Sequence, residues 1–190
     1  MLRSDAQDFD LRGAEREPYD LVVASHVLEH MLDPIKALLT WKNHLIGQDE
    51  ERERGGGGGA KGVMLLVLPW RNATFDKHRP PTLMQRLLRK FAGGPETHFE
   101  DMEKTLRTWS YADDPGLIEE ATCDTEGKCT AEETLAALRQ RIKEPGGSET
   151  LHWHVFDFDL IAQSLTCIGM EVVFMELWPP FHQVVVARTQ

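Results

Sequence analysis

Two histidines near the C-terminal end of the chain, His152 and His154, have a type and spacing that suggest chemistry. On an extended chain, side chains two positions apart point the same way, so both imidazoles would face one site. With His98 or His78 they could ligate a metal, because imidazoles from separated segments are common zinc ligands. A His-x-His pair without a third ligand at a recognisable interval is a weak metal signal, so the sequence predicts no metal. We instead expect His78, His152 and His154 to act on a substrate, as binding groups or general bases.

A second polar group, Asp76, His78 and Arg79, follows an apolar run that ends at Pro69. His78 brings a titratable base, and Arg79 brings a bidentate binder of carboxylate or phosphate. We expect Asp76 and Arg79 to bind the substrate. A surface ion-pair cluster is an equally good interpretation of the same residues.

A third group, Ser25, His26, Glu29 and His30, follows an earlier apolar run. In open α/β sheets, ligands bind at the carboxyl ends of the strands, which is where Ser25 and His26 would lie. His30 is expected to face the pocket, and Glu29 to brace the backbone in a structural role. A satisfied loop imidazole is an alternative for His26.

An α/β arrangement must position these groups. Residues 19–25 (YDLVVAS) form a short, valine-rich apolar run, typical of a strand that is buried on both faces of a parallel sheet. Asp33 as N-cap and Pro34 as first helical residue predict a helix start. Residues 62–70 (GVMLLVLPW) then predict the next strand, so the unit is a parallel crossover.

The region 71–151 lacks a regular pattern and contains several glycines and prolines. Helical pieces are expected at 83–91, 115–121 and 131–143. Loops this long in a compact domain are usually functional or disordered, so we interpret the region as a helical insertion or lid.

The chain closes with a helix that Asp157 can cap and Gly169 can end. Two β-rich runs follow, 170–178 and 181–188, with Pro179-Pro180 between them. So short a connection requires antiparallel neighbours. The sequence therefore predicts one α/β domain over residues 1–190, whose parallel sheet is finished by an antiparallel hairpin.

Composition limits the partners. The 190 residues are 41% hydrophobic and 27% charged, which suits one globular domain. No apolar run approaches the roughly 20 residues that a bilayer requires, and no apolar leader begins the chain, so we expect a cytoplasmic protein without membrane contact. The formal net charge of −10 opposes binding to nucleic acid. The 3 cysteines predict reduced thiols.

Three segments together resemble one protein family, the class I S-adenosylmethionine-dependent methyltransferases. Residues 19–39 (YDLVVASHVLEHMLDPIKALL) are similar to a strand, the "LEH…DP" connection and the next helix of that family. Residues 74–82 (TFDKHRPPT) and 152–161 (HWHVFDFDLI) resemble segments of a bacterial-type subgroup. The resemblance covers nearly the whole chain.

The resemblance implies a Rossmann-like methyltransferase sheet and S-adenosylmethionine as cofactor. The acceptor would be an oxygen or nitrogen of a small molecule or glycan. Asp5 and Ala6 resemble the acidic loop that contacts the adenine in such enzymes. Ser25 and His26 would lie where cofactor and acceptor meet.

One departure from the family concerns the cofactor. Its glycine-rich motif, and the acidic residue that ends its second strand, have no counterpart in this sequence. The chain therefore resembles the C-terminal part of the fold, as an N-terminally truncated domain would: a fragment, a mispredicted gene start or a degenerate relative. The alternative function is a noncatalytic remnant or partner-binding subunit that cannot hold the cofactor alone, and a second chain could complete the site. A metal-dependent hydrolase that uses the histidines is a third hypothesis.

Overall fold

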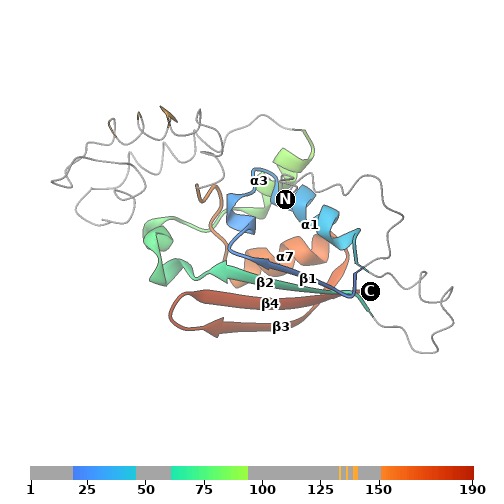
Figure 1. Ribbon diagram of the computed structural model, residues 1–190. Coiled ribbons are helices and arrows are strands. Elements are labelled where there is room, and N and C mark those ends of the chain that lie inside the picture. The colour runs from blue at the N-terminus through green and yellow to red at the C-terminus, as the bar shows by residue number, and fades with distance from the viewer. Residues whose placement is uncertain (1–18, 46–60, 94–132, 134–135, 137–138, 141–150) are drawn as a thin grey trace, which may run out of the picture.

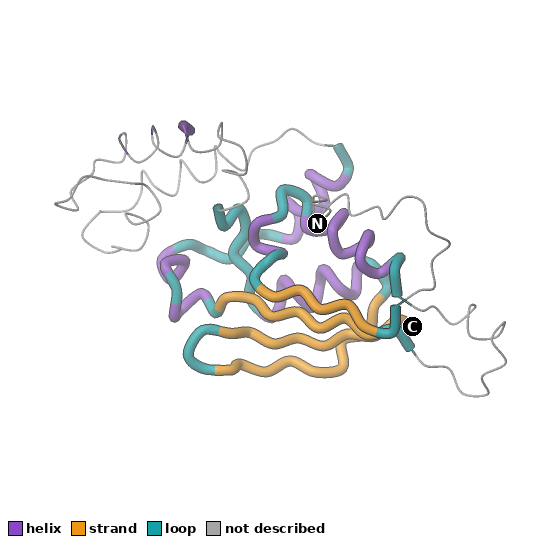
Figure 2. Tube along the Cα trace, in the orientation of Figure 1, coloured by secondary structure: helices purple, strands orange, loops and turns teal. Residues whose placement is uncertain are grey.

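The computed structural model describes residues 19–45, 61–93 and 151–190, together with the helical positions 133, 136, 139 and 140. Within these residues the chain forms an α/β structure, in which helices pack along a four-stranded mixed sheet (Figures 1 and 2). The fold class predicted from the sequence is confirmed at this level.

The sheet has the strand order β1-β2-β4-β3. Its strands are β1 (Leu21–Ser25), β2 (Val63–Pro69), β3 (Met170–Trp178) and β4 (His182–Thr189). β1 and β2 are parallel, as the crossover predicts, and β3 and β4 form the predicted antiparallel hairpin. The last strand, β4, is inserted between β2 and β3 and is antiparallel to both.

Three α-helices accompany the sheet in the described residues: α1 (Pro34–Lys42), α3 (Met84–Phe91) and α7 (Phe158–Cys167). Both predicted N-caps are confirmed, since Asp33 accepts a hydrogen bond from the Lys36 N–H at 3.0 Å and Asp157 one from the Leu160 N–H at 2.8 Å. Gly169 follows α7 with φ of 74°, in the left-handed conformation that ends many helices. The short 3-10 turns η1 (Leu28–His30), η2 (Arg71–Ala73) and η3 (Phe75–His78) lie in the connections.

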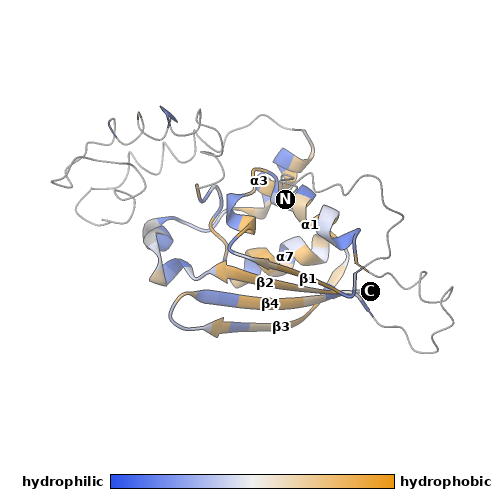
Figure 3. Ribbon diagram, in the orientation of Figure 1, coloured by the Kyte–Doolittle hydropathy of each residue, from blue (hydrophilic) through white to orange (hydrophobic). Residues whose placement is uncertain are grey.

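The core lies between the sheet and these helices, which cover the same side of it (Figure 1). Met64 and Leu66 of β2 are buried against a continuous apolar cluster that includes Leu38 of α1, Leu87 of α3 and Ile161 of α7. The strands carry mostly hydrophobic residues (Figure 3). Burial of this apolar surface is the main force that holds the helices on the sheet.

The exposure of β1 on the face away from the helices differs from the sequence prediction. Leu21 and Val23 are 51% and 56% exposed, so the expectation that this strand is buried on both faces is wrong. The physical reason is that β1 is the end strand of the described sheet, and that α1, α3 and α7 cover only the face on which Ala24 lies.

In the region 71–151, the predicted helical piece at 83–91 is observed as α3. The piece at 115–121 lies outside the described residues, and of 131–143 only four positions are described, all of them helical. The division of the chain into a domain and an insertion therefore stays a prediction. No helix among the described residues is both long and apolar enough to cross a bilayer.

The parallel pairing brings the carboxyl ends of β1 and β2 to one edge of the sheet, where Ser25 pairs with Val67. The segment 151–156 is held at this edge. The buried Gln183 donates from its amide nitrogen to the carbonyl oxygens of Pro69 at 2.8 Å and Phe156 at 3.0 Å. The Thr82 N–H donates to the Val155 carbonyl at 2.9 Å. Residues that are distant in sequence thus meet at the carboxyl edge.

Candidate functional site

The site begins at the residue that leaves β1. His26 has φ of 52°, a left-handed conformation that is uncommon for a residue other than glycine. Its N–H donates to the Val67 carbonyl at 2.9 Å, which fixes this turn to β2. The turn aims the imidazole along the carboxyl edge, where Nε2 lies 3.0 Å from Nδ1 of His182. Burial first, and then the neighbouring His182 and His152, lower the pKa of His26.

The side chain at the centre of the site is Glu29, on the short turn η1. Its side chain is fully buried, and its carboxylate oxygens accept no hydrogen bond from the part of the chain that the structure describes. Three imidazole nitrogens surround Oε1: Nδ1 of His26 at 3.4 Å, Nε2 of His30 at 3.8 Å and Nε2 of His152 at 4.0 Å. Burial raises the pKa of Glu29 to about 7.

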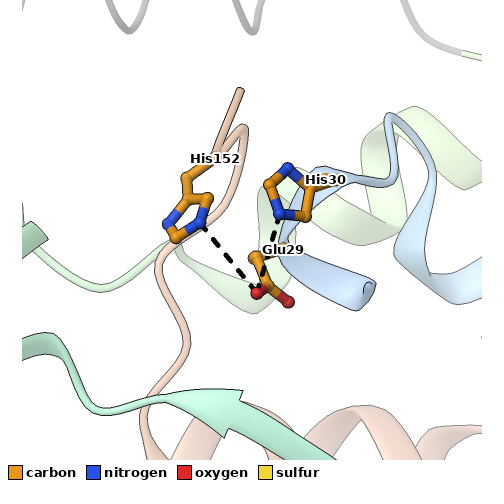
Figure 4. Close-up of side chains that lie close together, drawn as sticks. All are labelled: Glu29, His30 and His152. Carbon is orange, nitrogen blue, oxygen red and sulfur yellow. Dashed lines mark ion pairs between the residues drawn. The ribbon is translucent and has the colours of Figure 1, made fainter. Parts of the chain in front are cut away.

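His30 and His152 approach Glu29 from different segments, as Figure 4 shows. Nδ1 of His30 lies 3.0 Å from the Leu151 carbonyl oxygen, which can only accept, so this nitrogen carries the proton. Nε2 therefore points toward Glu29 with its lone pair when the ring is neutral. Burial, with the neighbouring His152, lowers the pKa of His30 to about 4, so the ring is neutral at pH 7.

The orientation of His152 comes from Asp76. The buried Asp76 carboxylate contacts Nδ1 of His152 at 2.7 Å through Oδ2 and Nη1 of Arg79 at 2.6 Å through Oδ1. Burial alone would raise the pKa of Asp76, but the hydrogen bond with His152 and the Arg79 charge outweigh it and hold this pKa below its ordinary value. The ionised carboxylate accepts from Nδ1, and Nε2 of His152 is left facing Glu29.

Arg79 connects η3 to the segment that carries the histidines. Its Nη1 donates to the His152 carbonyl at 2.8 Å, and its Nη2 to the Trp153 carbonyl at 3.4 Å. From the sequence, both Arg79 and His154 are expected to serve the substrate. The described contacts bring Arg79 to that segment through the backbone of residues 152 and 153, and join it through Asp76 to the imidazole of His152.

His154 is placed differently from His152. It is 1% exposed, its backbone N–H donates to the Glu29 carbonyl at 3.2 Å, and its ring packs edge-on against Phe156 with centroids 6.2 Å apart. The backbone of Glu29 is thus held by this segment. The expectation that the Glu29 side chain braces the backbone is not met among the described residues, because its carboxylate oxygens accept no hydrogen bond there. The central position of the Glu29 carboxylate is not foreseen from the sequence.

The structure therefore brings together five residues predicted for the site. Ser25, His26, His30, Asp76 and His152 all lie at the carboxyl edge of β1 and β2 or contact residues there. Arg79 joins them through Asp76. For His78 only the backbone is described, within η3. Asp5 and Ala6 lie outside the described residues, so their contact with a cofactor stays a prediction.

The chemistry of this arrangement follows from its groups. Imidazoles accept and donate protons near neutral pH, and a carboxylate with two imidazole nitrogens is also a ligand set for a metal ion. Within the described residues, one oxygen of Glu29 and one nitrogen each of His30 and His152 lie within 4.8 Å of one another. The described residues therefore form an α/β sheet with a cluster of imidazoles and carboxylates at the carboxyl ends of β1 and β2. Neither a scan of protein-family models nor a search of curated proteins found a match to the chain.

Proposed function

We propose that the chain transfers a methyl group from S-adenosylmethionine to an oxygen or nitrogen of a small molecule or glycan at this carboxyl edge. The observation that carries the proposal is the sheet itself: two parallel strands whose carboxyl ends gather imidazoles and carboxylates, followed by a terminal antiparallel hairpin. This is the arrangement that the resemblance to class I methyltransferases implies, and open α/β sheets bind their ligands at this edge.

The residues of this edge have distinct tasks in the proposal. Methyl transfer is an in-line displacement, in which the acceptor lone pair forms the bond to carbon and the sulfur keeps the electron pair of the bond that breaks. Asp5 and Ala6 hold the adenine, and Ser25 lies beside the reacting groups. The proton of the acceptor passes to His26, because its side chain, at 38% exposure, is the most accessible of the three imidazoles around Glu29.

The experiment is a transfer assay with methyl-labelled S-adenosylmethionine and a panel of hydroxyl, amine and glycan acceptors. We expect the wild-type chain to label at least one acceptor class, and His26→Ala to lower turnover by about 100-fold, within the range attributed to general-base catalysis. His44→Ala is the matched control, since His44 lies at the far end of α1, where its carbonyl accepts from the Tyr19 N–H. Equal rates for both variants would remove His26 from the proposal.

A second candidate function is a partner-binding subunit that does not hold the cofactor by itself. The exposure of Leu21 and Val23 favours it, because half-exposed apolar side chains on an end strand suit contact with another polypeptide. Light scattering separates the two candidates. A chain that is monomeric and transfers methyl groups supports the enzyme, whereas activity that appears only in a complex with a partner supports the subunit.

A further inference from the structure

The group formed by Glu29, His30 and His152 has the composition and orientation of a metal-binding site (Figure 4). We propose that these three residues bind one divalent transition-metal ion of the zinc type. The binding does not depend on methyl transfer, so it stands or falls on its own measurement. It assigns His30 and His152 to a metal, in place of the substrate role that the sequence suggests for them.

The distances between the ligand atoms suit such an ion after a small contraction. Nε2 of His30 and Nε2 of His152 lie 3.8 and 4.0 Å from Oε1 of Glu29. Bonds of about 2.1 Å to a tetrahedral zinc ion place ligand atoms about 3.4 Å apart. Each imidazole nitrogen therefore needs to approach Oε1 by about half an ångström, and the two imidazole nitrogens lie within 4.8 Å of each other. Small side-chain rotations provide such movements.

The imidazoles are already oriented for this task. Metal-ligating histidines usually donate their second ring N–H to a carboxylate or a backbone carbonyl, which fixes the tautomer and the ring. His152 has Asp76 in that position at 2.7 Å, and His30 has the Leu151 carbonyl at 3.0 Å. Both outer contacts involve Nδ1, and both leave Nε2 aimed at Glu29.

The buried carboxylate of Glu29 is a second, independent argument that a metal ion binds here. Glu29 is fully buried, and neither of its oxygens has a hydrogen-bond partner among the described residues. The surrounding nitrogens lie at 3.4 to 4.0 Å, beyond the usual 2.7–3.2 Å of a hydrogen bond, so they do not satisfy it directly. An unsatisfied buried carboxylate is costly, and a cation between it and the imidazoles removes that cost.

The ligand types select the class of ion. Two imidazole nitrogens and one carboxylate oxygen suit zinc, manganese, iron or nickel, whereas magnesium and calcium prefer oxygen ligands alone. The side chains of His30 and His152 keep 19% and 10% exposure, so a further ligand can approach from outside. If the proposed function holds, the acceptor oxygen or nitrogen would be such a ligand, and the ion would make its proton easier to remove.

The test uses the full chain, stripped with a chelator and titrated with Zn²⁺ in a calorimeter, with metal content measured after gel filtration. We expect one zinc ion per wild-type chain and no retention of magnesium. Glu29→Gln and His152→Ala should each weaken zinc binding more than about 100-fold, which is beyond the loss caused by removing an outer partner. Asp76→Asn, which removes the charge of such a partner and leaves one oxygen for two donors, should weaken it by about 10- to 100-fold. The matched control His44→Ala should bind as the wild type does.

A readout of folding and a spectrum complete the test. Glu29→Gln keeps the size of the side chain and removes the buried charge, so without metal it should melt no lower than the wild type, and zinc should no longer raise its melting temperature. Cobalt bound to the wild type should give visible ligand-field bands without a thiolate charge-transfer band. No stoichiometric zinc in the wild type, zinc retained by both ligand variants, or a thiolate band from cysteine ligands would each overturn the proposal.

Discussion

The ion pair at Asp76 offers a prediction about stability that depends only on the described contacts. The substitution Asp76→Asn keeps the shape of the side chain and removes its charge. Asp76 is 1% exposed and faces two donors, Nη1 of Arg79 at 2.6 Å and Nδ1 of His152 at 2.7 Å. The asparagine oxygen can accept from one donor, but its NH₂ group must then face the other.

The size of the effect follows from which bonds remain. Breaking a buried ion pair costs about 3–5 kcal/mol, and a single hydrogen bond to a charged group contributes about 1.5–3 kcal/mol. Arg79 keeps its bonds to the carbonyl oxygens of His152 and Trp153, so the loss falls below the full cost of a broken pair. We expect the free energy of unfolding to fall by about 2–3 kcal/mol, which corresponds to a melting temperature lower by about 4–12 °C for a chain of this size.

Urea unfolding followed by circular dichroism measures this loss. Asp20→Asn is the control, because Asp20 is exposed and a surface substitution changes stability by about 0.5 kcal/mol or less. If Asp76→Asn were as stable as this control, the contacts that join η3 to the segment 151–156 would contribute nothing, and the account of how the site is held together would be refuted.

Three further predictions concern the helix ends and the cofactor. Asp157→Ala should lower the free energy of unfolding by about 1 kcal/mol in urea titrations, because the N-cap of α7 is lost. An equal loss for Asp159→Ala, at an exposed position next to the cap, would argue that capping is not the cause. Gly169→Ala should lower the free energy of unfolding by about 1 kcal/mol, because the backbone at this position has a φ of 74°. The loss should exceed that of Gly93→Ala, since a Cβ at 169 would lie 3.2 Å from Lys42 Nζ, whereas a Cβ at 93 would meet no atom within 4 Å. Equal melting temperatures for the two variants would mean that the contact with Lys42 has no effect. In calorimetry, the 190-residue chain should bind S-adenosylmethionine with a dissociation constant above the micromolar range. The reason is that no residues that would contact the ribose and the methionine carboxylate are recognised in its sequence. Micromolar binding would mean that other residues supply these contacts.

The elements that local signals define could be predicted from the sequence. Asp33-Pro34 marks the start of α1, Asp157 the start of α7 and Gly169 the end of α7, because caps and left-handed residues act within one turn. The hairpin of β3 and β4 follows from its short connection. The insertion of β4 between β2 and β3 could not be predicted, since strand order depends on packing that no local pattern encodes.

The candidate site was predictable in its residue types and less so in its contacts. The end of the first predicted strand placed His26 at the carboxyl edge, where the structure has it. Its role there, and the expectation that His30 faces a pocket, stay predictions. The pairing of His152 with Asp76 joins positions 76 apart in the sequence, so only the folded chain reveals it. The sequence assigned Glu29 a structural role, whereas its side chain is fully buried on η1 and lies among three imidazoles that come from separate positions of the chain.

Hydrogen exchange with and without millimolar S-adenosylmethionine tests most directly whether the carboxyl edge is where the cofactor binds. We predict slower exchange in peptides that cover residues 22–31 and 151–156, which meet at this edge through the Glu29 and His154 backbones. Peptides around Gly62 and Thr189, at the opposite edge of the sheet, should exchange unchanged. Protection at that opposite edge, or none anywhere in the chain, would contradict the proposal that this protein is a methyltransferase acting at the carboxyl ends of β1 and β2.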